Sequence, residues 1–179
     1  MTVSNAAVLT ISDRVSRGEA EDRSGDLLAE LLQADGFTVA RRVVPDERDQ
    51  IATALRDLAG EARLVLTTGG TGLGPRDVTP EATSEVIERE APGIAQALRA
   101  DSIAKTPHGL LSRGVAGTVG STLVVNLPGS PGGVKDSLAA LDPIVDHAIA
   151  VLRGEITDHV PNTDASTRAV AARPTKRRR

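Results

Sequence analysis

The arrangement of apolar residues restricts the fold of this chain more than any other feature of its sequence. Residues 6–11 form a continuous apolar run, which is typical of a strand covered on both faces. Residues 38–44 and 64–67 predict two further short strands. Between these runs, apolar residues recur at helical spacing: Leu27, Leu28, Leu31, Leu32, Ile51, Leu55 and Leu58. Parallel neighbouring strands need crossover helices, so this order predicts a mostly parallel sheet with helices on both faces.

The second half of the chain departs from this order. Residues 114–119 and 122–127 predict two strands joined at Gly120-Ser121, and a glycine in such a short connection favours an antiparallel hairpin. Residues 134–152 continue as a last helical region. The sequence therefore predicts a parallel sheet that also carries a small hairpin.

Cap residues indicate where the helices begin and end. Asp22 or Ser24 is placed to cap the first helix, and Gly36 is placed to end it in a left-handed conformation. Pro80 stands at a first helical position, where its missing N–H has no partner to lose. A helix is therefore expected directly after the segment that precedes Pro80.

The composition narrows the possible chemistry. The chain has 179 residues, and we expect one compact domain at residues 1–154 followed by a polar, basic and flexible tail at 155–179. It contains no cysteine, which excludes a thiol nucleophile, a disulfide framework and a thiolate metal site. Phe37 is the only aromatic residue, which excludes base stacking on aromatic platforms. Hydroxyls, carboxylates, histidines and cationic side chains are the groups that remain available for any chemistry.

Charge is distributed unevenly along the chain. The net charge is -3, although the residues from Pro161 onward include six basic residues and one acid. The preceding part is therefore acidic, which makes it a poor general binder of nucleic acid. The basic end at 176–179 is either a solvated tail or an electrostatic tether. No stretch approaches the roughly 20 apolar residues of a membrane span, and residues 1–20 lack a secretory signal, so we expect a cytoplasmic protein.

The most unusual segment lies where the third predicted strand ends and the next helix begins. Residues 67–80 read Thr-Thr-Gly-Gly-Thr-Gly-Leu-Gly-Pro-Arg-Asp-Val-Thr-Pro. Glycines let backbone N–H groups approach an anion without a Cβ in the way, so the segment indicates phosphate binding. It is not a P-loop, because Pro75-Arg76 stands where Lys-Ser/Thr is required, and it lacks the third glycine of a dinucleotide site. The alternative is a tight connection without a ligand.

Two acidic residues belong near this segment. A carboxylate beside a phosphate site repels the ligand unless a cation lies between them, and Mg²⁺ is usually held by one or two carboxylates plus phosphate oxygens. Asp77 is therefore a candidate metal ligand; alternatively it pairs with Arg76 or caps a turn. Asp46 follows the second strand and so belongs to the same sheet edge, but it is also well placed to cap the helix beginning near Glu47.

Other polar loops supply further candidates. Ser12-Asp13-Arg14 follows the first strand and either faces a ligand or fixes the long loop after it. The proline-glycine loop at 126–133 either forms a second anion or ring site or only turns the chain. Ser112-Arg113 is a weaker candidate that could be a surface pair. The three histidines lack metal-ligand spacing, and we expect His147 to pack within an apolar helix.

Together these motifs resemble the Mog and MoaB proteins of molybdenum cofactor biosynthesis. The resemblance covers roughly residues 6–152 and rests on residues 12–14, 67–72, 76–82 and 126–131. It implies a three-layer α/β fold and a homotrimer. It also implies that, as in Mog members, AMP is transferred from Mg-ATP to molybdopterin with release of pyrophosphate.

The resemblance also implies roles for individual residues. Asp46 and Asp77 match the two important acids of the family, and we expect them to be catalytic and to hold Mg²⁺. The binding residues that it implies are Ser12, Asp13, Thr68, Gly69, Gly70, Thr71, Gly72, Ser112, Arg113, Pro128, Gly129 and Ser130. Among these, the turn at 69–72 would hold nucleotide phosphates, and residues 128–130 would line the cleft.

Two other functions remain open. A MoaB-type paralogue would bind a pterin or nucleotide with little or no adenylation; the presence of both acids favours catalysis over this alternative. An assembly module would instead use the trimer surface and the basic tail to recruit partners such as a molybdenum-insertion protein.

Overall fold

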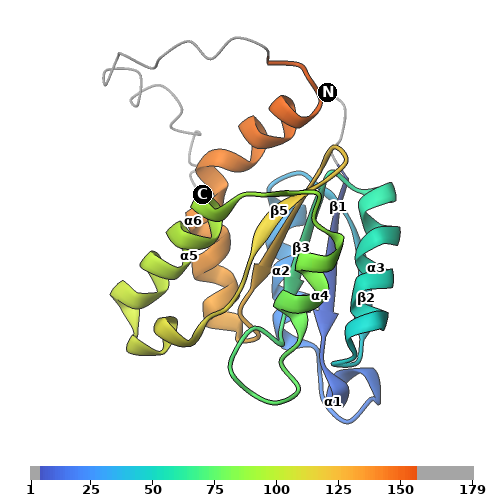
Figure 1. Ribbon diagram of the computed structural model, residues 1–179, viewed down its shortest axis with the longest axis vertical. Coiled ribbons are helices and arrows are strands. Elements are labelled where there is room, and N and C mark those ends of the chain that lie inside the picture. Colours follow the sequence, from blue (N-terminus) through green and yellow to red (C-terminus); the bar gives the residue numbers. More distant parts are fainter. Residues whose placement is uncertain (1–4, 157–179) are drawn as a thin grey trace, which may run out of the picture.

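A six-stranded sheet forms the middle layer of the fold (Figure 1). The computed structural model describes residues 5–156, and the predicted tail lies almost entirely outside them. The elements in chain order are β1 (Asn5–Ile11), α1 (Asp13–Ser16), α2 (Arg23–Ala34), β2 (Thr38–Val44), α3 (Arg48–Glu61), β3 (Leu64–Thr68), α4 (Thr79–Val86), β4 (Arg89–Glu90), α5 (Pro92–Lys105), the 3₁₀ helix η1 (Pro107–Leu111), β5 (Ala116–Val119), β6 (Thr122–Leu127) and α6 (Pro131–Leu152).

The strand order in the sheet is β2-β1-β3-β6-β5-β4. Strands β2, β1, β3 and β6 run parallel, whereas β5 pairs antiparallel with β6 and β4 pairs antiparallel with β5. The predicted parallel sheet and hairpin are therefore confirmed, and Gly120 turns the hairpin with a φ of 55°. Strand β4 was not predicted, because two exposed residues carry no apolar pattern.

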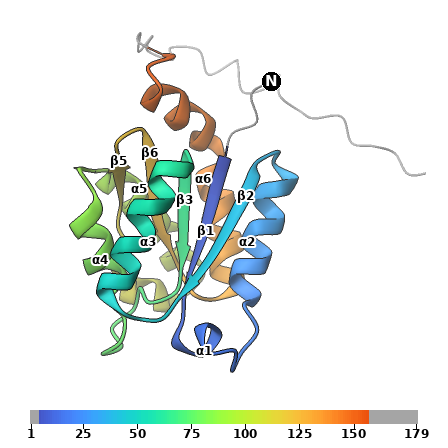
Figure 2. The same ribbon diagram turned by 90° about the vertical axis from the view of Figure 1, so that its right-hand side faces the viewer.

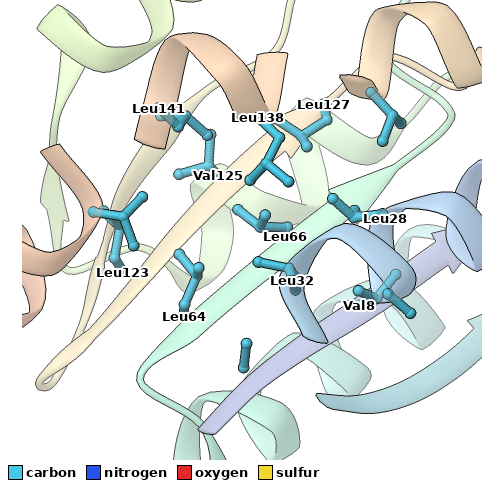
Figure 3. Close-up of a cluster of buried hydrophobic side chains, with 14 of the residues drawn as sticks. Val8, Leu28, Leu32, Leu64, Leu66, Leu123, Val125, Leu127, Leu138 and Leu141 are labelled. Atoms are coloured by element: carbon cyan, nitrogen blue, oxygen red, sulfur yellow. The ribbon is translucent and has the colours of Figure 1, made fainter. Parts of the chain in front are cut away.

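Helices cover both faces of the sheet (Figure 2). Helices α3 and α4 pack on one face, against alternate residues of the strands such as Ala7, Leu9 and Val65. Helices α2 and α6 pack on the other face, where Val8 and Leu66 belong to the buried cluster (Figure 3). Covering on both faces explains why residues 6–11 are continuously apolar. Among the described residues, no helix combines the length and apolar character that crossing a bilayer requires.

One expectation about an individual residue is wrong. His147 does not pack in the core; it lies exposed on α6. In the loop after β1, Ser12 caps the short helix α1 by accepting a hydrogen bond from the N–H of Val15. Asp22 caps α2 as expected, and Gly36 follows that helix with a φ of 94°.

The strand register brings four strand ends to one edge of the sheet. Ile11 at the end of β1 lies opposite Val44 at the end of β2. Thr68 at the end of β3 lies opposite Leu127 at the end of β6. Since the four strands are parallel, the loops that follow them begin side by side, and in Figure 1 they lie at the lower end of the molecule.

A buried hydrogen-bond network holds this edge together. Asn126, which is 5% exposed, donates to Thr67 Oγ1 (3.1 Å) and to Thr83 Oγ1 (2.9 Å). Its own Oδ1 accepts the N–H of Val115 (3.2 Å). The Thr83 hydroxyl donates in turn to the carbonyl of Thr79 (2.7 Å). One amide therefore ties β6 to β3, to α4 and to the segment before β5.

We expect Asn126→Ala to lower the free energy of unfolding by about 2–3 kcal/mol, because it leaves buried polar groups without partners. Urea titration followed by circular dichroism measures this change. Gln33→Ala at an exposed position of α2 is the control and is expected to stay within about 0.5 kcal/mol of the parent. A urea midpoint equal to that of the parent would contradict the role given to Asn126.

Candidate functional site

Most of the predicted binding residues lie at the sheet edge where the parallel strands end. Two of the loops there are in direct contact. The hydroxyl of Thr68 donates to the carbonyl of Pro128 (2.8 Å). A Cβ placed on Gly129 would lie 3.2 Å from the Cα of Gly69, so the two backbones touch. Ser112 and Arg113 come from elsewhere, between η1 and β5, and are brought to the same place.

The turn after β3 requires glycine. Gly69 and Gly70 have φ values of 104° and 63°, in the left-handed region that L side chains rarely adopt. A Cβ on Gly69 would also overlap the carbonyl oxygen of Ile11, and one on Gly70 would overlap the hydroxyl of Thr79. The glycines therefore serve a close approach of β3 to β1 and α4, in addition to any ligand.

The carbonyl groups of this turn are all held from one side. The four hydrogen bonds are Thr79 Oγ1 to the carbonyl of Gly69 (2.9 Å), Thr79 N–H to that of Gly70 (3.1 Å), Arg113 N–H to that of Thr71 (2.9 Å) and Arg113 Nε to that of Gly72 (2.6 Å). No described peptide bond is cis, so each carbonyl and the N–H of the next residue point in opposite directions.

This arrangement leaves a row of amides available to a ligand. Within residues 5–156, the N–H groups of residues 70–73 donate to no protein acceptor. Successive free amides in a glycine turn form a concave site that attracts anions. The turn therefore leaves amide donors that the protein does not use, and an anion such as a phosphate is the class of ligand that would accept them.

Asp77 lies against this turn. Its Oδ2 accepts the N–H of Gly74 (2.8 Å) and would be 2.9 Å from a Cβ on Gly72. The turn-capping alternative for Asp77 is therefore what the structure shows, while the pairing with Arg76 is not. Capping occupies one carboxylate oxygen and fixes where the other one lies.

Asp46 does not cap α3. Glu47 occupies the cap position of that helix, without a side-chain cap bond. Asp46 Oδ2 instead accepts the N–H of Asp13 (2.7 Å), and Asp13 Oδ1 accepts the N–H of Asp46 (3.1 Å). This reciprocal pair locks the ends of β1 and β2 together. Asp46 Oδ1 would be 3.2 Å from a Cβ on Gly70, so this acid also lies against the glycine turn.

The two paired acids have opposite pKa shifts. Burial raises the pKa of Asp46, and the nearby carboxylates of Asp13 and Asp77 act in the same direction. The guanidinium of Arg76 lowers the pKa of Asp13, because it donates to both of its oxygens at 3.1 Å. Arg76 also donates to Glu47 (2.7 Å). It therefore offsets the negative charges of Asp13 and Glu47, whereas the charge of Asp46 is offset less.

Residues of the two touching loops line two cavities. The first, of about 270 Å³, is lined in part by Thr71, Gly72, Ser112, Pro128 and Ser130. The second, of about 390 Å³, is lined in part by Ser12, Thr68, Gly69 and Gly129. These linings include all the predicted binding residues except Asp13, Gly70 and Arg113.

Asp46 and Asp77 are the residues that could hold a metal at this site. The described residues contain no group of three or more His, Cys, Asp or Glu side chains arranged to hold an ion. A complete protein cage is thus absent from residues 5–156, while two carboxylates beside a phosphate-binding turn match the usual donor set of Mg²⁺.

Sequence reasoning missed Thr79 and Arg99, and it included Arg113 among the binding residues without its role of bracing the turn. Thr79 and Arg113 hold its carbonyls, and Arg99 holds the backbone around Arg113. The sequence could have indicated Thr79, because this residue stands at the start of the helix that directly follows the turn. No sequence pattern connects Arg99 or Arg113 to the turn, because the contact depends on the packing of distant segments.

Asp46→Asn is expected to raise the urea midpoint at pH 7–8. The pKa of Asp46 in the folded protein is raised above the ordinary value of 3.8. The stability that this carboxyl group contributes is therefore fully present below pH 3.8 and is lost as pH rises through the folded pKa. Asparagine removes this cost of the charge at neutral pH and keeps an oxygen for the Asp13 amide. The gain should therefore disappear below about pH 4.

Asp13→Asn is the matched control with the opposite sign. Its folded pKa is lowered, so its contribution is present above 3.8 and is lost as pH falls through the folded pKa. This variant should unfold at lower urea than the parent at pH 7. Equal losses in both variants at neutral pH would contradict the electrostatic account of Asp46.

Comparison with known proteins places the chain among molybdenum cofactor proteins. Residues 7–147 match a family model described as a probable molybdopterin binding domain. The molybdopterin adenylyltransferase of Helicobacter pylori strain J99 is 36% identical over 159 residues, which are 86% of this chain and 90% of that protein. The molybdenum cofactor synthesis protein cinnamon of Drosophila melanogaster is 40% identical over 84% of this chain and 26% of its own length.

A solved structure gives the same result. The molybdopterin biosynthesis enzyme MoaB of Thermus thermophilus has a TM-score of 0.79 and 46% identity, covering 85% of this chain and 98% of that one. Several curated relatives are much longer: the chain spans about a quarter to a half of the length of four of them.

Proposed function

The chain belongs to the family of probable molybdopterin binding domains, and from this membership we propose that it acts in molybdenum cofactor biosynthesis as a molybdopterin adenylyltransferase. The proposed reaction transfers AMP from Mg-ATP to molybdopterin and releases pyrophosphate. Relatives named molybdopterin adenylyltransferase, at 36–42% identity over 73–86% of this chain, support the proposal.

The observation that carries this proposal is the row of free amides in a turn whose residues help to line two cavities. Both substrates are phosphate esters, so their phosphates must meet in one place while their ring systems lie on different sides. The amides of residues 70–73 supply donors, and the same turn lines both cavities, the first through Thr71 and Gly72 and the second through Gly69. A site that binds one phosphate ester alone would not need the second cavity.

The residues present fit a magnesium ion. Asp46 is an acid whose charge is disfavoured by burial, and Asp77 has one oxygen fixed by the turn. When bound, Mg²⁺ would shield the phosphates from these carboxylates and stabilise the departing pyrophosphate. In this proposal Asp46 and Asp77 hold the ion, and their positions are set by Asp13 and Gly74.

The chemistry needs positioning more than an activated side chain. The terminal phosphate of molybdopterin attacks the α-phosphorus of ATP in line, which forms one P–O bond as the bond to pyrophosphate breaks. The amides of the turn hold the reacting phosphates and offset their repulsion. No covalent enzyme intermediate is required, in keeping with a cavity lining that includes no cysteine and no recognised hydrolase elbow.

Further parts of the proposal concern the assembly. We extend it to a cytoplasmic homotrimer that passes its product to a molybdenum-insertion partner. Relatives described as bifunctional molybdenum cofactor biosynthesis proteins, of which this chain spans 48%, support a close link to another activity. The basic tail remains a candidate tether and lies outside the described residues.

Incubation with Mg-ATP and molybdopterin, followed by chromatography, tests the proposal. We expect adenylated pterin and pyrophosphate in equal amounts. Similarity to MoaB structures at 46% and 31% identity favours one alternative, a paralogue that binds without adenylation. Pterin binding without either product, under conditions in which a known adenylyltransferase works, would establish that alternative.

Asp77→Asn should reduce turnover by about 100-fold or more, the scale expected for loss of a transition-state electrostatic group. The fold should persist, because an asparagine oxygen can still accept the Gly74 N–H. Pyrophosphate release measures the effect across a range of Mg²⁺ concentrations. Glu85→Gln is the control: it removes an exposed acid of α4 that pairs with Arg48 and Arg56 of α3. Turnover of Asp77→Asn within a few-fold of the parent would reject the metal role.

A further inference from the structure

Arg113 makes contacts that the proposed reaction does not use. Its Nε donates to the carbonyl of Gly72 (2.6 Å), and its Nη2 donates to the carbonyl of Asp77 (2.6 Å). Its Nη1 pairs with the carboxylate of Glu81 at the start of α4. All three guanidinium nitrogens are therefore engaged by the protein itself. Arg113 was expected to bind a ligand, but its geometry is that of an internal brace.

The two carbonyls that Arg113 holds lie at the ends of one exposed segment. Residues 73–76 between them are all exposed, and this segment carries the Asp77 carboxylate toward the turn. Within the segment the N–H of Asp77 donates to the carbonyl of Gly74 (2.9 Å). Fixing both ends of a short loop removes most of its conformational freedom before a ligand arrives.

Arg99 holds Arg113 in turn. It projects from α5, and its Nε and Nη2 donate to the carbonyls of Ser112 (3.0 Å) and Gly114 (3.2 Å). These are the residues on either side of Arg113. The N–H of Arg113 also donates to the carbonyl of Thr71. A continuous series of contacts therefore runs from α5 to the glycine turn.

We propose that Arg99 and Arg113 form a relay that positions Asp77 and the amides of the glycine turn, an inference that rests on the proposed function. Arg99 fixes the backbone around Arg113, and Arg113 fixes both ends of the segment that carries Asp77. In this proposal both are positioning residues, because the bonds that they make in the structure are to protein carbonyls and to Glu81. The relay also shapes the first cavity, whose wall includes Gly72 and Ser112.

The relay depends on the shape of arginine. A planar guanidinium presents donors in a fixed fork and can hold two carbonyls and a carboxylate at once. An ammonium group is a compact point charge on a flexible stem and cannot reproduce this geometry. Lysine at position 113 should therefore keep the charge near Glu81 while losing the grip on at least one carbonyl.

Amide hydrogen exchange in the substrate-free protein tests the relay. Arg113→Gln should speed exchange of the Gly74 and Asp77 amides by about tenfold or more, because both amides are protected by hydrogen bonds within the segment. Exchange of the amides in β1 and β3 should stay unchanged. In the adenylation assay kcat should fall by about 30-fold with KM for ATP within about threefold. Arg113→Lys should recover only part of both effects. Arg42→Gln, which breaks an exposed pair with Asp57, is the control.

A double variant tests whether Arg99 acts through Arg113. Arg99→Gln should change exchange and kcat in the same direction, and Arg99→Gln/Arg113→Gln should equal Arg113→Gln alone. Additive effects would overturn the relay, as would unchanged exchange at Gly74 and Asp77 in Arg113→Lys or Arg113→Gln. A rise in KM alone would show that Arg113 contacts substrate. Exchange needs no substrate, so a parent without adenylation would remove the proposed function and leave this test intact.

Discussion

The site depends on the close approach of β3 to β1, where only a glycine fits. A side chain at Gly69 would overlap the carbonyl of Ile11; without one, the backbone of Gly69 approaches both Ile11 and Gly129. Residues of the two loops that touch there line both cavities. Backbone packing therefore shapes the candidate site, and the parallel register of β1, β3 and β6 determines where it lies.

The sequence predicted the sheet and the position of the site because both leave local patterns. Apolar runs marked the strands, and glycines marked the turn at 69–72. Contacts between distant segments leave no such pattern. The mutual bonds of Asp13 and Asp46 follow from the pairing of Ile11 with Val44, and the grip of Arg113 on Gly72 joins residues 41 positions apart. Without an observable register, the residues around Asp46 favoured a helix cap, and only the family resemblance assigned this acid to the site.

The acids of the site are arranged at a cost to stability. Asp13 is compensated by Arg76, but Asp46 is half-buried beside two other carboxylates, which raises its pKa. A fold selected for stability alone would place a neutral residue there. In the proposed function, a divalent ion would remove this penalty when substrate binds, so the strain of the free protein would be relieved only in the complex.

The arginines at the turn impose a further constraint on how phosphates are bound. Arg76 is occupied by Asp13 and Glu47, and Arg113 is occupied by Gly72, Asp77 and Glu81. In a P-loop a lysine side chain reaches the phosphates directly. Here Arg113 holds the turn and Arg76 is paired with acids, so in the proposed reaction the positive potential for the phosphates would come from backbone amides and from the metal. Rigid amides stabilise charge without reorganising, which makes the bracing of the turn part of the binding itself.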